Sequence, residues 1–153
     1  MGEYKLTEEI IALSSSSNWD RAKLEWALHE IYEAEEPDTC LCGKYPIIEI
    51  CILRNRLNGK LATVGNCCVK KFIGLPSDRI FQAVKRVRKD STKSLNAEAI
   101  SHAQEKGWLN TWESDFYFDI MRKRNLSQKQ AAKKIEINEK IAQQMQRAAS
   151  KQG

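Results

Sequence analysis

The sequence predicts a mainly helical protein with a small zinc-bound β-hairpin, an α+β fold in which residues 1–153 form a single compact domain. All five cysteines lie between Cys40 and Cys68. In the same stretch, Asn58-Gly59 separates two runs of β-favouring residues, which is typical of a hairpin. The sequence on either side carries apolar residues at helical spacing. A chain of this length can bury one modest core.

Charge divides the domain into three segments. Residues 1–38 form an acidic helical arm, residues 39–74 a zinc-binding hairpin–helix module, and residues 75–153 a helical region whose C-terminus frays. Residues 1–40 hold 3 basic and 10 acidic side chains, a net charge of −7, whereas residues 41–95 hold 12 basic and 3 acidic, a net charge of +9. The basic middle indicates an anionic partner, although the two regions could equally neutralise each other within one fold.

The acidic arm is expected to contain two helices. Thr7 begins the first, over residues 6–13, and the serines at 14–17 end it because their hydroxyls compete for backbone hydrogen bonds. Asn18 then caps a helix over residues 19–36, which Pro37 stops. The helical spacing of Leu24, Ala27, Leu28 and Ile31 gives that helix an apolar face.

Four helices are predicted after the cysteines. Ser77 caps residues 78–90, Asn96 caps a helix that ends at Gly107, and Asn110 or Thr111 starts one over residues 112–125. Ser127 and Gln130 have the spacing of a capping box for a long last helix. Its apolar stripe is Ile137, Ile141, Met145 and Ala148.

The cysteines are better interpreted as metal ligands than as disulfides. The N-terminus lacks a secretory signal and no apolar run is long enough to span a bilayer, which predicts a cytoplasmic protein with reduced thiols. A two-residue turn at Asn58-Gly59 would place Cys51 opposite Asn66, beside the helix that carries Cys68. The predicted ligands of one structural Zn²⁺ ion are therefore Cys40, Cys42, Cys51 and Cys68.

Three alternatives to this ligand set stay open. Cys67 is the alternative to Cys68 as the fourth ligand. His29 or His102 could replace one thiolate, although each lies in a helical pattern away from the cysteines. The cysteines could also pack as small apolar residues without a metal.

The pattern TCLCGKYPI, then CILRNRLNG, then VGNCCVKKFIG resembles a family of small phage and prophage-type zinc-binding proteins. The helical stretch GWLNTWESDFYFDIMRKRNLSQKQAAKKIEINEKI is similar to a segment that accompanies such modules, so the resemblance covers residues 18–141. It implies a zinc site and a cytoplasmic location, but no activity, because most members are uncharacterised. Lys44 stands where that family often has a histidine, which makes Cys51 more important as a ligand.

No enzymatic activity is expected. The sequence contains no zinc-deaminase signature, phosphate-binding loop, H-E-x-x-H motif or nucleophile elbow, and a zinc ion with four thiolates has no open position for a substrate. We therefore expect neither a small-molecule substrate nor a membrane partner.

Nucleic acid is the partner that the basic middle favours. The alternative is an interaction factor of a phage or mobile element that binds and modulates or inhibits a host protein, in which the acidic run from Glu30 to Asp38 could mimic nucleic acid. The residues predicted to contact phosphates are Arg54, Arg56, Lys70, Lys71, Lys85, Arg86, Arg88 and Lys89.

Overall fold

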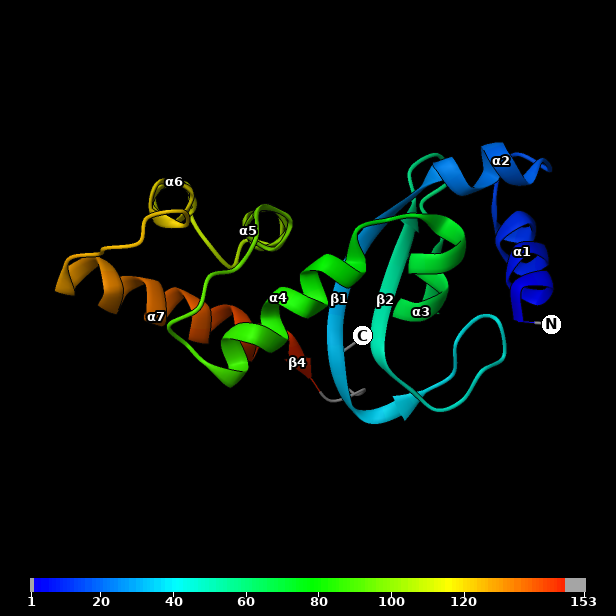
Figure 1. The fold of residues 1–153 in the computed structure, drawn as a ribbon. Coiled ribbons are helices and arrows are strands. Elements are labelled where there is room, and N and C mark those ends of the chain that lie inside the picture. The colour runs from blue at the N-terminus through cyan, green and yellow to red at the C-terminus, as the bar shows by residue number, and fades with distance from the viewer. Residues whose placement is uncertain (1, 148–153) are drawn as a thin grey trace. The chain divides into compact units, whose positions relative to one another are not determined.

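The computed structural model describes residues 2–147, which fall into two compact units (Figure 1). The first comprises Met1–Asp78 with the C-terminal residues from Gln146, and the second comprises Arg79–Met145. The predicted combination of predominant helices with a small antiparallel sheet is confirmed. The single-domain organisation stays a prediction, and each unit is described by itself. None of the described helices is long and apolar enough to cross a membrane.

The first unit is built on a four-stranded sheet with the order β3-β2-β1-β4. The strands are β1 (Trp26–Asp38), β2 (Ile47–Asn55), β3 (Leu61–Gly65) and β4 (Gln146–Arg147). The pairs β1–β2 and β2–β3 are antiparallel, whereas β4 runs parallel to β1 over two residues. The sheet is therefore larger than the predicted hairpin, because a strand from the acidic arm extends it.

The helix predicted over residues 19–36 is wrong. Only α2 (Trp19–Ala22) and the 3₁₀ turn η1 (Lys23–Glu25) are helical there, and β1 follows. Leu24, predicted on the buried face, is 65% exposed, whereas Ile31 and Tyr32 are fully buried in the sheet. Pairing with β2 buries these β-favouring side chains, so tertiary contacts override a helical spacing that arose from only a few apolar positions.

The hairpin of β2 and β3 is confirmed, but its predicted register and two-residue turn are wrong. Cys51 pairs with Val64 instead of Asn66, and the loop contains the four residues from Arg56 to Gly59. The Asn55 side chain causes the difference, since its Oδ1 accepts hydrogen bonds from the N–H groups of Leu57 (2.8 Å) and Asn58 (3.1 Å). The pairing register is shifted by two residues, so each side chain lies on the same face of the sheet as it would in the predicted register.

Three short helical segments complete the first unit. α1 (Gly2–Leu13) is longer than the predicted helix and buries Leu6 and Ile10. α3 (Asn66–Cys68) follows β3 directly and continues as the π-helical turn η2 (Val69–Ile73). Gly74 ends this turn with a φ of +84°, a conformation that favours glycine.

The second unit contains α4 from Arg79 onward and the three helices α5 to α7. They are α4 (Ser77–Lys89), α5 (Ala97–Glu105), α6 (Thr111–Ile120) and α7 (Gln128–Gln144). Their predicted caps at Asn96, Asn110 and Ser127 are confirmed, although α6 ends five residues before the predicted 125. Ala148 and the fraying predicted for the last residues lie outside the described residues. The buried core of the unit includes Phe81, Val84, Val87, Ile100, Tyr117, Ile137 and Ile141.

A buried hydrogen-bond network joins α6, α7 and the loop before α5. The Tyr117 hydroxyl accepts a hydrogen bond from the Leu95 N–H (2.9 Å) and donates one to Asn138 Oδ1 (2.6 Å). The Asn138 amide in turn donates to the carbonyls of Ser91 and Lys93, each at 2.8 Å. One phenol and one amide therefore satisfy the polar groups of a loop that has little regular structure.

Replacing Tyr117 by Phe is expected to destabilise the second unit by about 1–3 kcal/mol, because the Leu95 N–H and Asn138 Oδ1 would lose their buried partner. Urea unfolding monitored by circular dichroism measures this change. Tyr4→Phe is the matched control, since Tyr4 is 63% exposed and its loss of the same oxygen should change the unfolding free energy by less than about 0.5 kcal/mol. Equal effects of the two substitutions would contradict the role given to the network.

Candidate metal centre and basic surfaces

Three of the four predicted ligands lie together. The sulfur atoms of Cys40, Cys42 and Cys68 are all within 4.8 Å of one another, close enough to hold one metal ion. Cys40 and Cys42 come from the loop between β1 and β2, and Cys68 ends α3. Of the two alternatives, Cys68 belongs to this cluster, whereas the Cys67 side chain is exposed.

The Cys40–Lys44 turn brings the first two thiols to the same side. The Gly43 N–H donates to the Cys40 carbonyl (2.7 Å), and the Cys40 N–H donates to the Lys44 carbonyl (2.9 Å). Gly43 has a φ of +94°, which explains why glycine follows the second cysteine. The Leu41 N–H, between the two cysteines, donates to the Thr63 carbonyl (3.0 Å) and so fixes the turn to β3.

The three thiols differ in acidity because they share a small volume. Burial raises the pKa of Cys40, although the Gly65 N–H, 3.2 Å from its sulfur, acts in the opposite direction. Burial and the nearby Cys40 charge raise the pKa of Cys68. Burial alone would also raise the pKa of Cys42, but hydrogen bonds from the Lys44 N–H and from the other two thiols lower it. Cys42 is therefore the thiol of the three whose pKa its surroundings lower, whereas those of Cys40 and Cys68 are raised.

Cys51 does not belong to the group of three. Its side chain is fully buried on β2, and burial raises its pKa to about 12, although the nearby Ser77 side chain acts in the opposite direction. The Cys40 charge also raises the Cys51 pKa, so this thiol lies within electrostatic reach of the cluster. The role of Cys51 as fourth ligand stays a prediction.

A polar network fixes the start of α3 beside the cluster. The Ser77 hydroxyl donates to Asn66 Oδ1 (2.6 Å), and the Asn66 amide donates to Glu49 and Asp78, each at 3.1 Å. Gly65 occupies the N-cap position of α3, and the Asn66 side chain binds these partners instead of capping its own helix. The network therefore positions Cys68, two residues along α3.

Comparisons of the chain with protein-family models, with curated proteins and with solved structures gave no match.

The predicted phosphate contacts of the first unit differ in what they touch. Arg56 donates through Nη2 to the Leu24 carbonyl, and Lys70 pairs with Asp78 at 3.4 Å. Arg54 and Lys71 are exposed and have no partner among the residues that the structure describes. Of these four residues, Arg54 and Lys71 are thus the more available.

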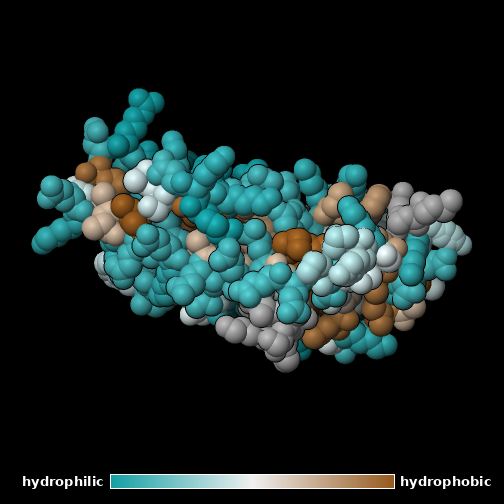
Figure 2. All heavy atoms as spheres, turned by 90° about the horizontal axis from the view of Figure 1, so that it is seen from below, coloured by the Kyte–Doolittle hydropathy of each residue, from teal (hydrophilic) through white to brown (hydrophobic). Residues whose placement is uncertain are grey.

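In the second unit, two of the four predicted contacts hold the fold together. Arg86 donates through Nε (3.1 Å) and Nη2 (3.0 Å) to the Ser94 carbonyl, and Arg88 donates to the Ala142 carbonyl (3.0 Å). Lys85 and Lys89 lie one helical turn apart on α4 with exposed side chains. The face drawn in Figure 2 is mostly hydrophilic, with scattered apolar patches.

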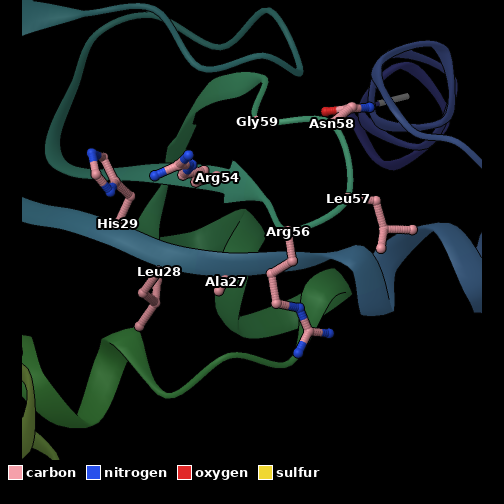
Figure 3. A pocket seen from close by; sticks show the side chains of 8 residues that line it. All are labelled: Ala27, Leu28, His29, Arg54, Arg56, Leu57, Asn58 and Gly59. Carbon is pink, nitrogen blue, oxygen red and sulfur yellow. The ribbon is translucent and has the colours of Figure 1, made fainter.

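Sequence reasoning missed a hollow at the loop end of the hairpin, lined in part by His29 and Arg54 (Figure 3). The prediction had placed His29 within a helix, so nothing associated it with the hairpin arginines. The register of β1 against β2 brings these residues together, and this pairing has no local sequence signal.

A buried carboxylate holds the hairpin loop in place. Glu25 Oε1 accepts hydrogen bonds from the Ser15 N–H (2.8 Å) and from Asn55 Nδ2 (2.9 Å), and Oε2 accepts one from the Ser16 N–H (2.8 Å). The Asn55 amide and these backbone groups lower the pKa of Glu25, although burial opposes them. The carboxylate therefore joins the serine loop after α1 to the end of β2.

Because the Glu25 pKa is lower in the folded state, its carboxylate stabilises the fold above the ordinary glutamate pKa of about 4.3, and this contribution is lost as the pH falls through the folded-state value. Glu25→Gln should therefore destabilise the protein at pH 7, and the gap from the wild type should narrow below about pH 4. Thermal unfolding between pH 3 and 7 measures it. Glu9→Gln, at an exposed position of α1, is the control. A gap that does not change with pH would contradict the ionised role of Glu25.

Proposed function

We propose that the protein binds one structural zinc ion. The observation that carries this proposal is the convergence of Cys40, Cys42 and Cys68. Thiolates are the commonest ligands of structural zinc, and a divalent cation would remove the cost of ionising three neighbouring thiols. A reducing compartment such as the cytoplasm would keep them available.

Cys51 is the thiol that we propose as the fourth ligand. Zinc in structural sites takes four ligands in a tetrahedron. Ile50, the residue before Cys51 in β2, pairs with Gly65, and the Gly65 N–H contacts the Cys40 sulfur. Cys51 is therefore only one residue along the strand from a position that lies beside the cluster.

Zinc content tests the ligand set directly. The purified protein should contain about one zinc per chain, and Cys40→Ser, Cys42→Ser, Cys51→Ser and Cys68→Ser should each lower zinc content and thermal stability, because metal binding contributes to folding. Cys67→Ser is the matched control, since Cys67 is exposed and adjacent to Cys68, and it should retain its zinc. Full zinc retention by Cys51→Ser would exclude it as a ligand, and a folded wild type without metal would refute the site.

We also propose that the zinc-stabilised protein binds nucleic acid through its basic residues. The support is the excess of basic side chains over residues 41–95, together with exposed cations that no described residue neutralises, such as Arg54 and Lys71. Contacts of this kind are made with phosphates, so binding should be sensitive to salt and tolerant of sequence. Such a role fits a small protein of a phage or mobile element.

The triple variant Lys71→Gln, Lys85→Gln, Lys89→Gln should bind a fluorescent single-stranded oligonucleotide more weakly than the wild type. Its plot of log affinity against log salt should also be less steep by about 2, because each lost phosphate contact reduces the slope by roughly 0.7. Fluorescence anisotropy between 50 and 200 mM salt, roughly the range in which such contacts weaken, measures both quantities.

A control triple, Arg21→Gln, Lys123→Gln, Lys129→Gln, removes the same charge from other exposed positions. An equal change in slope for the two triples would mean that net charge alone acts, against a defined surface. A stoichiometric protein partner that survives nuclease treatment of a lysate, with no oligonucleotide binding, would instead support the host-protein role.

A further inference from the structure

A hollow of about 510 Å³ lies where β1 passes the loop of the hairpin (Figure 3). Its walls mix cationic and apolar side chains, and its volume falls within the range of roughly 300–1,000 Å³ that is usual for small-ligand sites. The hollow lies wholly within the first unit. Its lining residues are Ala27, Leu28, His29, Arg54 and the loop from Arg56 to Gly59.

Hydrogen bonds hold the loop wall of this hollow in one conformation. The Asn55 side chain accepts from the N–H groups of Leu57 and Asn58, its carbonyl accepts from the Gly59 N–H (2.9 Å), and its N–H donates to the Lys60 carbonyl (2.8 Å). Asn55 is itself fully buried and held by Glu25. A ligand would therefore meet a wall that is already ordered, which reduces the entropy cost of binding.

The loop has no backbone donors left for an anion. The N–H groups of Leu57, Asn58 and Gly59 are bound to Asn55, and the Lys60 N–H donates to Asn58 Oδ1 (2.9 Å). The donors available to a ligand are consequently side chains, and Arg56 already donates to the Leu24 carbonyl. This leaves His29 and Arg54, which have no partner among the described residues.

An irregularity in β1 brings these two side chains to the same side. Leu28 pairs with Leu53 and Glu30 pairs with Ile52, so His29 is an extra residue in the ladder. Such bulges redirect a side chain and are frequent beside functional sites. In Figure 3, the Arg54 side chain extends toward His29 on one side of β1, while the Leu28 side chain points away on the other.

Arg54 makes no ion pair with any residue that the structure describes. The Glu25 carboxylate, which holds the neighbouring Asn55, accepts three hydrogen bonds, from Ser15, Ser16 and Asn55. The Arg54 guanidinium lies beside Gly59, with Nη2 3.9 Å from the place that a Cβ atom would occupy. Gly59 has a φ of +77°, which favours glycine, and Arg54 remains exposed beside this turn of the loop.

We propose that this hollow is a phosphate-binding subsite that takes one nucleotide unit of a bound strand, with His29 and Arg54 on the phosphate. The proposal rests on the proposed nucleic-acid binding and deepens it. A guanidinium and an imidazole provide directed donors for phosphate oxygens, and the exposed Leu57 offers apolar surface to the sugar or base. His29 is thereby assigned to the same surface as the hairpin arginines.

The test uses the full-length, zinc-loaded protein and a fluorescein-labelled single-stranded oligonucleotide. Arg54→Gln and His29→Gln should each weaken binding about 5-fold or more at 50 mM salt, and Arg54→Gln should reduce the salt slope by roughly 0.7. Arg21→Gln, which removes the same charge from an exposed position on α2, should leave affinity within about 2-fold. Wild-type affinity and slope in Arg54→Gln would overturn the subsite while leaving nucleic-acid binding intact.

A second measurement separates the subsite from the proposed function. Inorganic pyrophosphate added to the ¹⁵N-labelled protein should shift the His29 ring and Arg54 side-chain signals, and these shifts should be absent in Arg54→Gln. If the wild type binds no oligonucleotide but shows these shifts, the phosphate subsite stands and the nucleic-acid function fails. Absence of both shifts overturns the subsite. Displacement of the oligonucleotide by polyglutamate as readily as by unlabelled strand would also overturn it, in favour of an acidic protein.

Discussion

Three sulfur atoms within 4.8 Å of one another cannot all carry negative charge unless a cation lies among them. The three sulfur atoms come from two separate parts of the chain. The Cys40–Lys44 turn supplies two thiols, and the short helix after β3 supplies the third. A bound metal would convert the repulsion into the strongest link between the hairpin, the preceding loop and α3. The sheet and the cluster therefore stabilise the same arrangement.

Backbone pairing makes this arrangement possible before any metal binds. The Gly65 N–H, which contacts the Cys40 sulfur, belongs to the residue that ends β3 and pairs with Ile50 of β2. The Leu41 N–H reaches the Thr63 carbonyl of the same strand. Since β2 also pairs with β1, an error in the register of either pair would move the thiols relative to one another. Asn66 and Ser77 then fix the helix that carries Cys68.

Local chemistry could be predicted from the sequence, and long-range pairing could not. The caps at Asn96, Asn110 and Ser127 depend on side chains that bond to backbone three residues further on, so residue type, and for Ser127 the spacing to Gln130, identifies them. The three clustered cysteines could likewise be predicted from the sequence, because a turn and a hairpin bring them together. β1 was not, since the spacing of Leu24, Ala27, Leu28 and Ile31 fits a helix until β2 is present. The register error had one cause, the capture of the loop by the Asn55 side chain.

Counting basic residues along the chain overstates the surface available to an anion. Arg56, Arg86 and Arg88 satisfy carbonyl oxygens at loops and helix ends, so removing them would damage the fold as well as any interface. Arg54 differs because the residues around it are already paired: Asn55 holds the loop and the backbone N–H groups, and Glu25 holds Asn55. Arg54 has no partner among the residues that the structure describes and lies beside a loop whose backbone N–H groups are paired, so it is available to a partner outside the chain. That contrast, and not the net charge of +5, is the physical basis for placing a phosphate at the hairpin.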